Sequence, residues 1–252
     1  MRIHTFFTLP QVQPEELVDQ TVVVIDVLRS STTICTALKN GVRSIVPVVN
    51  SADAIAMQER LGKENTVLGG ERHGRLIPGF DLGNSPAEYL PEILSGKNLT
   101  FVSSNGTPAI AGARTALCTV IAGMVNISAV VHFLTDRTDD ITIICAGKSD
   151  RFSIEDAVCA GMITNQLLAT ASRKDAELND AGKVAAKLGS SYSGELLEMF
   201  RQSEHGRYLI SIGMGGDLQL CAEIDSVPVI PIYKEDHIEQ FNVTVDLDNH
   251  GS

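Results

Sequence analysis

The feature that most constrains the fold is an alternation between short apolar, β-branched runs and segments with helical spacing. Several runs, such as TVVVIDV at 21–27, are apolar throughout. Strands of this kind are typical of a sheet covered on both faces. The alternation predicts an α/β protein: a three-layer α/β/α sandwich with a mainly parallel or mixed sheet. The expected strands are 21–27, 44–49, 66–68, 99–103, 116–121, 141–145, 208–212 and 227–232, and the expected helices are 32–40, 52–61, 108–113, 126–135, 154–170, 176–188, 194–203 and 218–224.

The chain shows no firm domain boundary. Its 252 residues suffice for one large α/β domain or two small ones, and no low-complexity linker interrupts them. We therefore expect a single domain over residues 1–252. The stretch 170–207 is charged, helical in pattern and without a strand signal, which indicates a helical insertion or cover. A strand, polar turn and helix recur along the chain; two similar halves would produce this, but so would any α/β protein.

The charge balance limits the partners. Lys plus Arg is 20 and Asp plus Glu is 31, which gives a net charge of −11. Such a surface repels nucleic acid and anionic membranes, so neither is an expected partner. An anionic ligand would need local Arg side chains or a bound metal. The N-terminus lacks a signal-like apolar run, no stretch approaches the ~18 apolar residues of a membrane helix, and the five cysteines form no C-x-x-C. We expect a cytoplasmic protein.

Ligands of open α/β sheets bind beyond the carboxyl ends of the strands, so the segments that follow the strands are the candidate sites. In the first, an apolar strand ends at Asp26 and continues through Arg29 into four hydroxyl residues that open a helix. A helix N-terminus favours phosphate, Arg29 could clamp it, and Asp26 could hold a metal. A plain helix cap needs only one hydroxyl residue. The hydroxyl residues are Ser30, Ser31, Thr32 and Thr33.

The second candidate is the long segment 69–86. Its glycines and prolines exclude regular structure, and it exceeds the ~12–15 residues of the longest ordinary connections. Leu76, Ile77 and Phe80 favour burial and hence an ordered loop. A solvated surface loop is the alternative. The polar residues that make it a candidate are Glu71, Arg72, Arg75, Asp81 and Asn84, with His73 between them.

The third candidate is the turn SSNGTP at 103–108. Asn105 and Gly106 permit close approach of the backbone to an anion or a metal-bound water, with Ser104 and Thr107 beside them. A plain turn explains these residues equally well.

The fourth candidate is the segment 147–156. Ser153 and Asp156 match a capping-box pattern, so Asp156 could serve only to cap a helix, whereas Glu155 could face a metal. The remaining motifs carry less weight: GMGGD at 213–217 lacks the dinucleotide-binding pattern, and no P-loop, D-x-D-x-[TV] or G-x-S-x-G motif occurs.

Together these segments resemble the 2-phosphosulfolactate phosphatase family. The resemblance is carried by IDVLRSSTTICTAL (25–38), LGGERHGRLIPGFDLGNSPAEY (68–89), SSNGT (103–107) and SIEDAVCAG (153–161), with a fainter echo at 213–229. It implies Mg²⁺-dependent hydrolysis of (R)-2-phospho-3-sulfolactate to 3-sulfolactate and phosphate, a step of coenzyme M biosynthesis. Ser30 and Ser103 stand where the resemblance leads us to expect Ala and Thr.

A small anionic phosphate ester suits these residues. Such a substrate carries several negative charges, which Arg29, Arg72 and Arg75 could offset. Mg²⁺ prefers one or two carboxylates with waters and phosphate oxygens. The candidate metal ligands are Asp26, Glu71, Glu155 and Asp156, with Asp26 and Glu71 ranked first. The catalytic candidates are Asp26, Arg29, Glu71, Asp81 and Asn105, and the substrate-binding candidates are Ser30, Ser31, Thr32, Thr33, Arg72, Arg75, Asn84, Ser104, Gly106 and Thr107.

The mechanism and the substrate stay open at this point. Water could attack the phosphoryl group with Asp81 or Asp156 as general base, or Asp26 could form a covalent intermediate. The substrate could be another phosphorylated hydroxy acid, and the fold could serve a non-catalytic anion-binding protein. A homodimer is the default expectation for such an enzyme.

Overall fold

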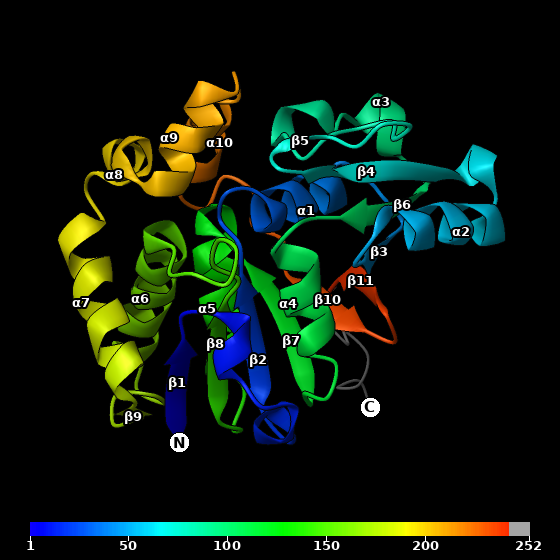
Figure 1. Cartoon of the computed structure of the whole chain (residues 1–252). Helices are drawn as coiled ribbons and strands as arrows, with labels where there is room; N and C mark the ends of the chain where they lie inside the picture. Colours follow the sequence, from blue (N-terminus) through cyan, green and yellow to red (C-terminus); the bar gives the residue numbers. More distant parts are fainter. Residues whose placement is uncertain (242–252) are drawn as a thin grey trace, which may run out of the picture.

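The computed structural model describes residues 1–241 as an α/β protein with an eleven-stranded, mixed but mostly parallel sheet that is flanked by helices (Figure 1). This confirms the predicted fold class. The strand order is β5-β4-β6-β3-β11-β10-β7-β2-β8-β1-β9. The strands are β1 (Arg2–Phe6), β2 (Thr21–Ile25), β3 (Ser44–Val48), β4 (Thr66–Arg72), β5 (Arg75–Leu76), β6 (Asn98–Val102), β7 (Cys118–Ala122), β8 (Ile141–Cys145), β9 (Glu177–Leu178), β10 (Pro231–Lys234) and β11 (His237–Gln240).

The helices occupy the connections between these strands. The α-helices are α1 (Ser30–Lys39), α2 (Ser51–Leu61), α3 (Pro91–Leu94), α4 (Gly106–Gly112), α5 (Ile127–Thr135), α6 (Ile154–Leu168), α7 (Asp180–Tyr192), α8 (Leu196–Gln202), α9 (Glu204–Ser211) and α10 (Asp217–Ala222), and short 3-10 turns lie at Leu9–Gln11, Pro14–Leu17, Lys63–Asn65, Pro86–Glu88 and Met124–Asn126. Among the described residues no helix is both long and apolar enough to cross a membrane.

The sheet consists of two parallel sets of strands joined by a hairpin. Strands β7, β2, β8 and β1 are parallel to one another, and so are β3, β6 and β4. The β10–β11 hairpin lies between the sets and is antiparallel to β7 on one side and β3 on the other. The two parallel sets of strands therefore run in opposite directions within the sheet. In Figure 1 the sheet twists so that β4 and β6 lie crosswise above β2 and β7, and their carboxyl ends point toward α1.

The core explains why the central strands are apolar at every position. All five residues of β2 and of β8 are buried. Val23 and Ile25 of β2 belong to the cluster under α5 and α6, whereas Val22 and Val24 belong to the cluster under α1 and α4. Each such side chain contributes roughly 1.5–3 kcal/mol when buried. Two covered faces therefore require the unbroken apolar pattern seen in the sequence.

Three expectations about the elements are wrong. The predicted strand at 208–212 is the end of helix α9, which the Ser203 hydroxyl caps by accepting the N–H of Gly206. Leu209 is buried but Ile210 is exposed, so the apolar run follows a helical period. The stretch 170–207 contains the two-residue strand β9, so it is not free of strands. Strand β1 and the second strand of the hairpin, β11, were not predicted.

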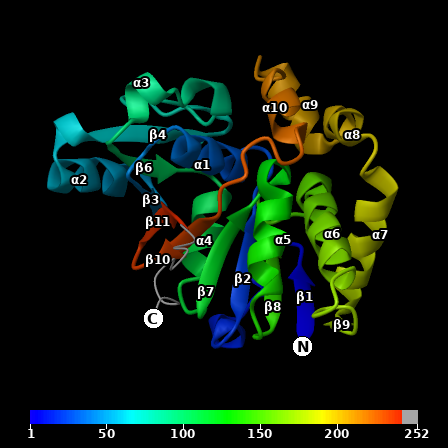
Figure 2. The same cartoon turned by 180° about the vertical axis from the view of Figure 1, so that it is seen from behind.

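The stretch 170–207 contains α7, α8 and the start of α9, and its role as an insertion or cover stays a prediction. Helix α7 lies along α6 on the outer side of the sheet, and α8, α9 and α10 lie above the carboxyl ends of the central strands (Figures 1 and 2). The N-terminus of α9 is thereby held close to the polar segments that follow β2 and β8. A single domain over 1–252 stays a prediction, and residues 242–252 lie outside the described part of the chain.

The contact between α6 and α7 gives a test of packing. A Cβ on Gly161 would lie 1.8 Å from the carbonyl oxygen of Ala185, so Gly161→Ala must push the helices apart. We expect it to lower the free energy of unfolding by about 1–3 kcal/mol in urea. Gly194→Ala is the control, because its Cβ would meet no atom within 4 Å. Equal stabilities of the two variants would contradict the close contact.

Candidate active site

Asp26 stands at the junction of the two sets of strands. It follows β2 directly and is 5% exposed. A Cβ on Gly106, at the start of α4 after β6, would lie 2.7 Å from Asp26 Oδ2 and 2.7 Å from Ser30 Oγ. The first and third candidate segments therefore touch.

The surroundings of Asp26 hold it in place and disfavour its charge. The Ser30 hydroxyl donates to Oδ2 over 2.8 Å, and the backbone N–H of Asp26 donates to Ser31 Oγ over 2.9 Å. Burial raises the pKa of Asp26, and the nearby charge of Glu71 adds to that rise. The bond from Ser30 and the proximity of His205 act in the opposite direction.

Two further carboxylates come from the first turn of α6. Asp156 accepts the N–H of Val27 over 2.8 Å and that of Gly147 over 3.1 Å, so it joins the segments after β2 and β8. Ser153 makes no side-chain capping bond, so the capping interpretation of Asp156 is wrong. Burial raises the pKa of Asp156 well above its usual range, and the charges of Asp26 and Glu155 raise it further.

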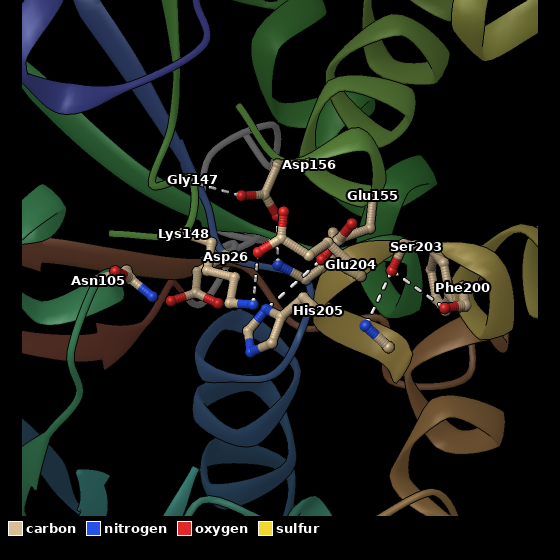
Figure 3. Close-up of polar contacts among 12 residues, drawn as sticks. Asp26, Asn105, Gly147, Lys148, Glu155, Asp156, Phe200, Ser203, Glu204 and His205 are labelled. Atoms are coloured by element: carbon tan, nitrogen blue, oxygen red, sulfur yellow. Dashed lines mark hydrogen bonds and ion pairs between the residues drawn. The ribbon is translucent and has the colours of Figure 1, made fainter. Parts of the chain in front are cut away.

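Glu155 and His205 form a pair beside Asp26 (Figure 3). Glu155 is 2% exposed, and its Oε1 has no hydrogen-bond partner. His205 Nδ1 lies 3.5 Å from that oxygen, which is close enough for an ion pair but too long for a good hydrogen bond. Sequence reasoning missed His205, because it lies outside the candidate segments and is brought in by helix α9.

Glu71 connects the second and third candidate segments. Its Oε1 accepts the N–H of Ser104 over 2.6 Å and its Oε2 accepts the N–H of Gly74 over 2.7 Å. Arg72 donates to the carbonyl oxygens of Val49 and Ser103. These bonds fix the ends of β4 and β6 against each other, and they engage both oxygens of Glu71.

Arg29 is part of a buried ion pair. Its Nη1 lies 2.6 Å from Asp217 Oδ2, and its Nη2 donates to the carbonyl oxygen of Gly74 over 2.9 Å. Asp217 Oδ1 also accepts the Ser85 hydroxyl over 2.6 Å. Asp217, in the GMGGD segment that sequence reasoning discounted, thus ties helix α10 to two of the candidate segments. The Nη1 and Nη2 groups of Arg29 are therefore already engaged in contacts within the protein.

The hydroxyl residues of α1 mostly hold the turn together. Thr32 Oγ1 donates to the carbonyl oxygen of Val27 over 3.1 Å, and Thr33 Oγ1 donates to that of Asn84 over 2.9 Å. Ser31 accepts from the backbone of Asp26, as described above. The predicted substrate-binding roles of these side chains stay predictions, and their observed bonds are internal.

The third segment is joined to the fourth. Asn105 Oδ1 accepts the N–H of Ser149 over 3.0 Å. Thr107 Oγ1 donates to the carbonyl oxygen of Val48 over 2.8 Å, and its N–H donates to Ser103 Oγ. Ser104 is exposed at the rim. Asn105, Gly106 and Ser104 therefore line the edge of the junction, whereas Thr107 faces inward and supports β3.

Among residues 1–241, the side chains of three other predicted residues make no hydrogen bond to the group around Asp26. Asp81 is exposed and accepts the N–H of Leu68 over 2.8 Å, which supports the edge of β4. Arg75 is exposed in β5 opposite Arg72. Asn84 is buried, and its Oδ1 has no hydrogen-bond partner. The contacts give Asp81 a structural role in β4 and do not bring it to Asp26.

The carboxylates around Asp26 could supply one or two ligands to a Mg²⁺ ion whose other ligands are waters and a phosphate group. Within residues 1–241 no group of three His, Cys, Asp or Glu side chains stands ready to hold a metal. Mg²⁺ usually needs only one or two carboxylates, since waters and substrate phosphate complete its shell. Burial raises the pKa of Asp26, and Glu155 Oε1 has no hydrogen-bond partner, so a bound cation would stabilise the charged form of both. Among the predicted ligands these two fit best, because Glu71 and Asp156 already accept two N–H groups each.

Known proteins resemble the chain over nearly its whole length. The sequence profile of the family described as "2-phosphosulpholactate phosphatase" matches residues 7–236. A protein of Symbiobacterium thermophilum, named "Probable 2-phosphosulfolactate phosphatase", is 40% identical over 224 residues, which cover 89% of this chain and 95% of that protein. Proteins with the same name from Clostridium tetani (36% identical, 93% and 98% covered) and Carboxydothermus hydrogenoformans (35% identical, 98% of both covered) are similar.

The raised pKa of Asp26 predicts a pH-dependent gain in stability for Asp26→Asn. A carboxyl whose pKa is higher in the folded state costs stability as the pH rises above its unfolded value of 3.8. Asp26→Asn should therefore raise the melting temperature of the metal-free protein more at pH 7.5 than at pH 4.5.

Asp140→Asn is the opposite-sign control. Slight burial would raise the pKa of Asp140, but the hydrogen bonds and charge of Arg2 outweigh it and lower the pKa, so this carboxylate stabilises the fold at neutral pH. Asp140→Asn should lower the melting temperature at pH 7.5, and by less as the pH falls through the lowered pKa. A gain for Asp26→Asn that is independent of pH would contradict the account.

The ion pair of Arg29 and Asp217 predicts a large loss on truncation. Asp217→Ala leaves a buried guanidinium without its carboxylate, which should lower the free energy of unfolding by about 3–5 kcal/mol. Asp180→Ala breaks the exposed pair with Lys183 and should cost less than about 1 kcal/mol. Similar losses in urea unfolding would show that the Arg29 pair is not effectively buried.

Proposed function

The chain belongs to the 2-phosphosulfolactate phosphatase family, and on that basis we propose that it hydrolyses (R)-2-phospho-3-sulfolactate to 3-sulfolactate and phosphate with Mg²⁺ as its cofactor. The observation that carries this proposal is the group around Asp26. Buried carboxylates from the segments after β2 and β8 meet a helix N-terminus and the turn after β6. Carboxylates and anion-binding backbone in one place suit a cation and a phosphate together.

The charge of the site supports a metal-assisted reaction. The protein has a net charge of −11, and Asp26, Glu155 and Asp156 repel one another and any phosphate ester. Asp26 and Glu155 would hold Mg²⁺, which when bound polarises the phosphoryl group and offsets these charges. A purely anion-binding protein would gain nothing from buried carboxylates beside its ligand.

The chain's own groups have distinct roles in this proposal. The first turn of α1, after Asp26, would direct its dipole and its remaining N–H groups toward the phosphoryl oxygens, since the N–H groups of Ser31 and Thr33 already donate to backbone carbonyl oxygens. The turn Ser104–Asn105–Gly106 presents backbone to the same place. His205, paired with Glu155, is positioned to hold a proton near the ester oxygen that leaves as a hydroxyl. Asp26 could serve as a metal ligand or as the attacking group, and the residues around it suit both.

A phosphate-release assay tests the proposal. The protein should release phosphate from (R)-2-phospho-3-sulfolactate with excess Mg²⁺ and lose that activity in a chelator. Asp26→Asn should lower kcat by at least about a hundredfold, because a charged group at the reaction centre is lost. Asp180→Asn, an exposed carboxylate at the start of α7, should keep kcat within about twofold.

Two outcomes of the same assay would contradict the proposal. A strong preference for an ester that lacks the sulfonate would assign another phosphorylated hydroxy acid as substrate. Absence of phosphate release from every small ester, with tight anion binding, would assign a binding protein.

A separate measurement decides the role of Asp26. If Asp26→Asn abolished turnover but kept Mg²⁺ and substrate binding, Asp26 would be the nucleophile and not a metal ligand.

Our proposals for the location and assembly of the protein rest on its sequence alone. A cytoplasmic location, no nucleic acid or membrane partner, and a homodimer remain our proposals for this chain. Gel filtration with light scattering measures the assembly directly.

A further inference from the structure

A pocket of about 210 Å³ shares Glu155 and His205 with the candidate active site and extends beyond them to residues with no role in the reaction proposed above. Glu155 and His205 form its inner wall, and Lys148 and Arg151 line it from the segment after β8. Figure 3 draws Lys148 together with Glu204, Glu155 and His205. The pocket is therefore continuous with the candidate active site and has two cations in its wall.

A tight turn fixes these two cations relative to each other. The N–H of Lys148 donates to the carbonyl oxygen of Arg151 over 2.9 Å, and the N–H of Arg151 donates back over 3.1 Å. Ser149 and Asp150 between them have φ of 51° and 59°, as a two-residue hairpin turn requires. The bonds from Ser149 to Asn105 and from Gly147 to Asp156 anchor this turn to the active site. The turn therefore presents both side chains to one pocket.

The present partner of Lys148 is weakly held. Lys148 Nζ lies 3.0 Å from Glu204 Oε1 and 5.2 Å from the centre of the Tyr208 ring. The Glu204 side chain is 74% exposed, so this ion pair contributes little and a ligand anion can replace it. Arg151 has no acidic partner within 4 Å among the described residues. The wall also carries Glu155 and Glu204, so a negative group would bind on the side of Lys148 and Arg151 and would displace the exposed Glu204 side chain.

We propose that Lys148 and Arg151 bind the second anionic group of the substrate, the sulfonate or the carboxylate that is not transferred. The inference rests on the proposed function, which places the phosphoryl group at Asp26. A ligand held at both places would bind more tightly, because Lys148 and Arg151 add charge-assisted hydrogen bonds to those made by the phosphoryl group. Lys148 and Arg151 would then set the preference for phosphate esters that carry an additional oxyanion.

The kinetic test uses three esters on wild type, Lys148→Ala and Arg151→Ala. The substrates are (R)-2-phospho-3-sulfolactate, 2-phospholactate without the sulfonate, and phosphoethanesulfonate without the carboxylate. Loss of a charge-assisted bond should raise KM by about tenfold or more for esters that carry the bound group, with kcat within about twofold. The ester without that group should keep its KM, which identifies the sulfonate or the carboxylate. Lys183→Ala on α7 is the control and should change neither constant.

A binding measurement keeps this inference separate from the proposed function. Calorimetric titration of wild type with 3-sulfolactate, lactate or 2-hydroxyethanesulfonate requires no turnover. We expect Lys148→Ala and Arg151→Ala to weaken the binding of 3-sulfolactate by about tenfold or more. Unchanged binding, or an equal rise of KM for all three esters, would overturn the assignment. Failure of wild type to hydrolyse any ester would refute the phosphatase proposal alone.

Discussion

The structure depends on burying three carboxyl groups, those of Asp26, Glu155 and Asp156, at one point. Asp156 is the centre of this arrangement, because its two oxygens accept N–H groups from the segments after β2 and β8. Asp26 and Glu155 lie close enough to raise its pKa further. Ionising such a buried carboxyl group costs free energy, and a cation bound beside it lowers that cost. The fold therefore holds carboxyl groups whose ionisation a bound cation would favour.

The junction exists because the sheet reverses direction once. The β10–β11 hairpin joins two parallel sets that run oppositely, and the twist turns their carboxyl ends toward each other. In a sheet with one direction throughout, the ligand site lies along a single edge. Here Glu71 near the end of β4 and Gly106 after β6 reach the same place as Asp26 after β2. Asp156 after β8 and His205 from α9 join them, so residues from five separate segments meet.

Local patterns predicted a large part of this arrangement. Apolar runs indicated β2 and β8, and polar turns after the strands indicated Asp26, Glu71, Asn105 and Glu155. Residues whose importance comes from contacts with distant parts of the chain could not be predicted from the local sequence pattern. Asp217 sits in an ordinary glycine turn, and His205 in a surface helix whose apolar end imitates a strand. Asp156 matches a local capping motif, but its bonds to Val27 and Gly147 take precedence. Sequence patterns record local preference, whereas these contacts depend on tertiary packing.

Under the proposed function, the carboxylates around Asp26 would bind Mg²⁺ tightly only when a phosphate group completes its ligands. Calorimetric titration of Mg²⁺ into the protein, with and without saturating inorganic phosphate, tests this most directly. We predict weak binding of the ion alone and binding about tenfold tighter or more with phosphate, as reciprocal coupling of two ligands requires. Asp26→Asn should abolish the coupling. Equal Mg²⁺ affinity with and without phosphate, or full coupling in Asp26→Asn, would contradict the account.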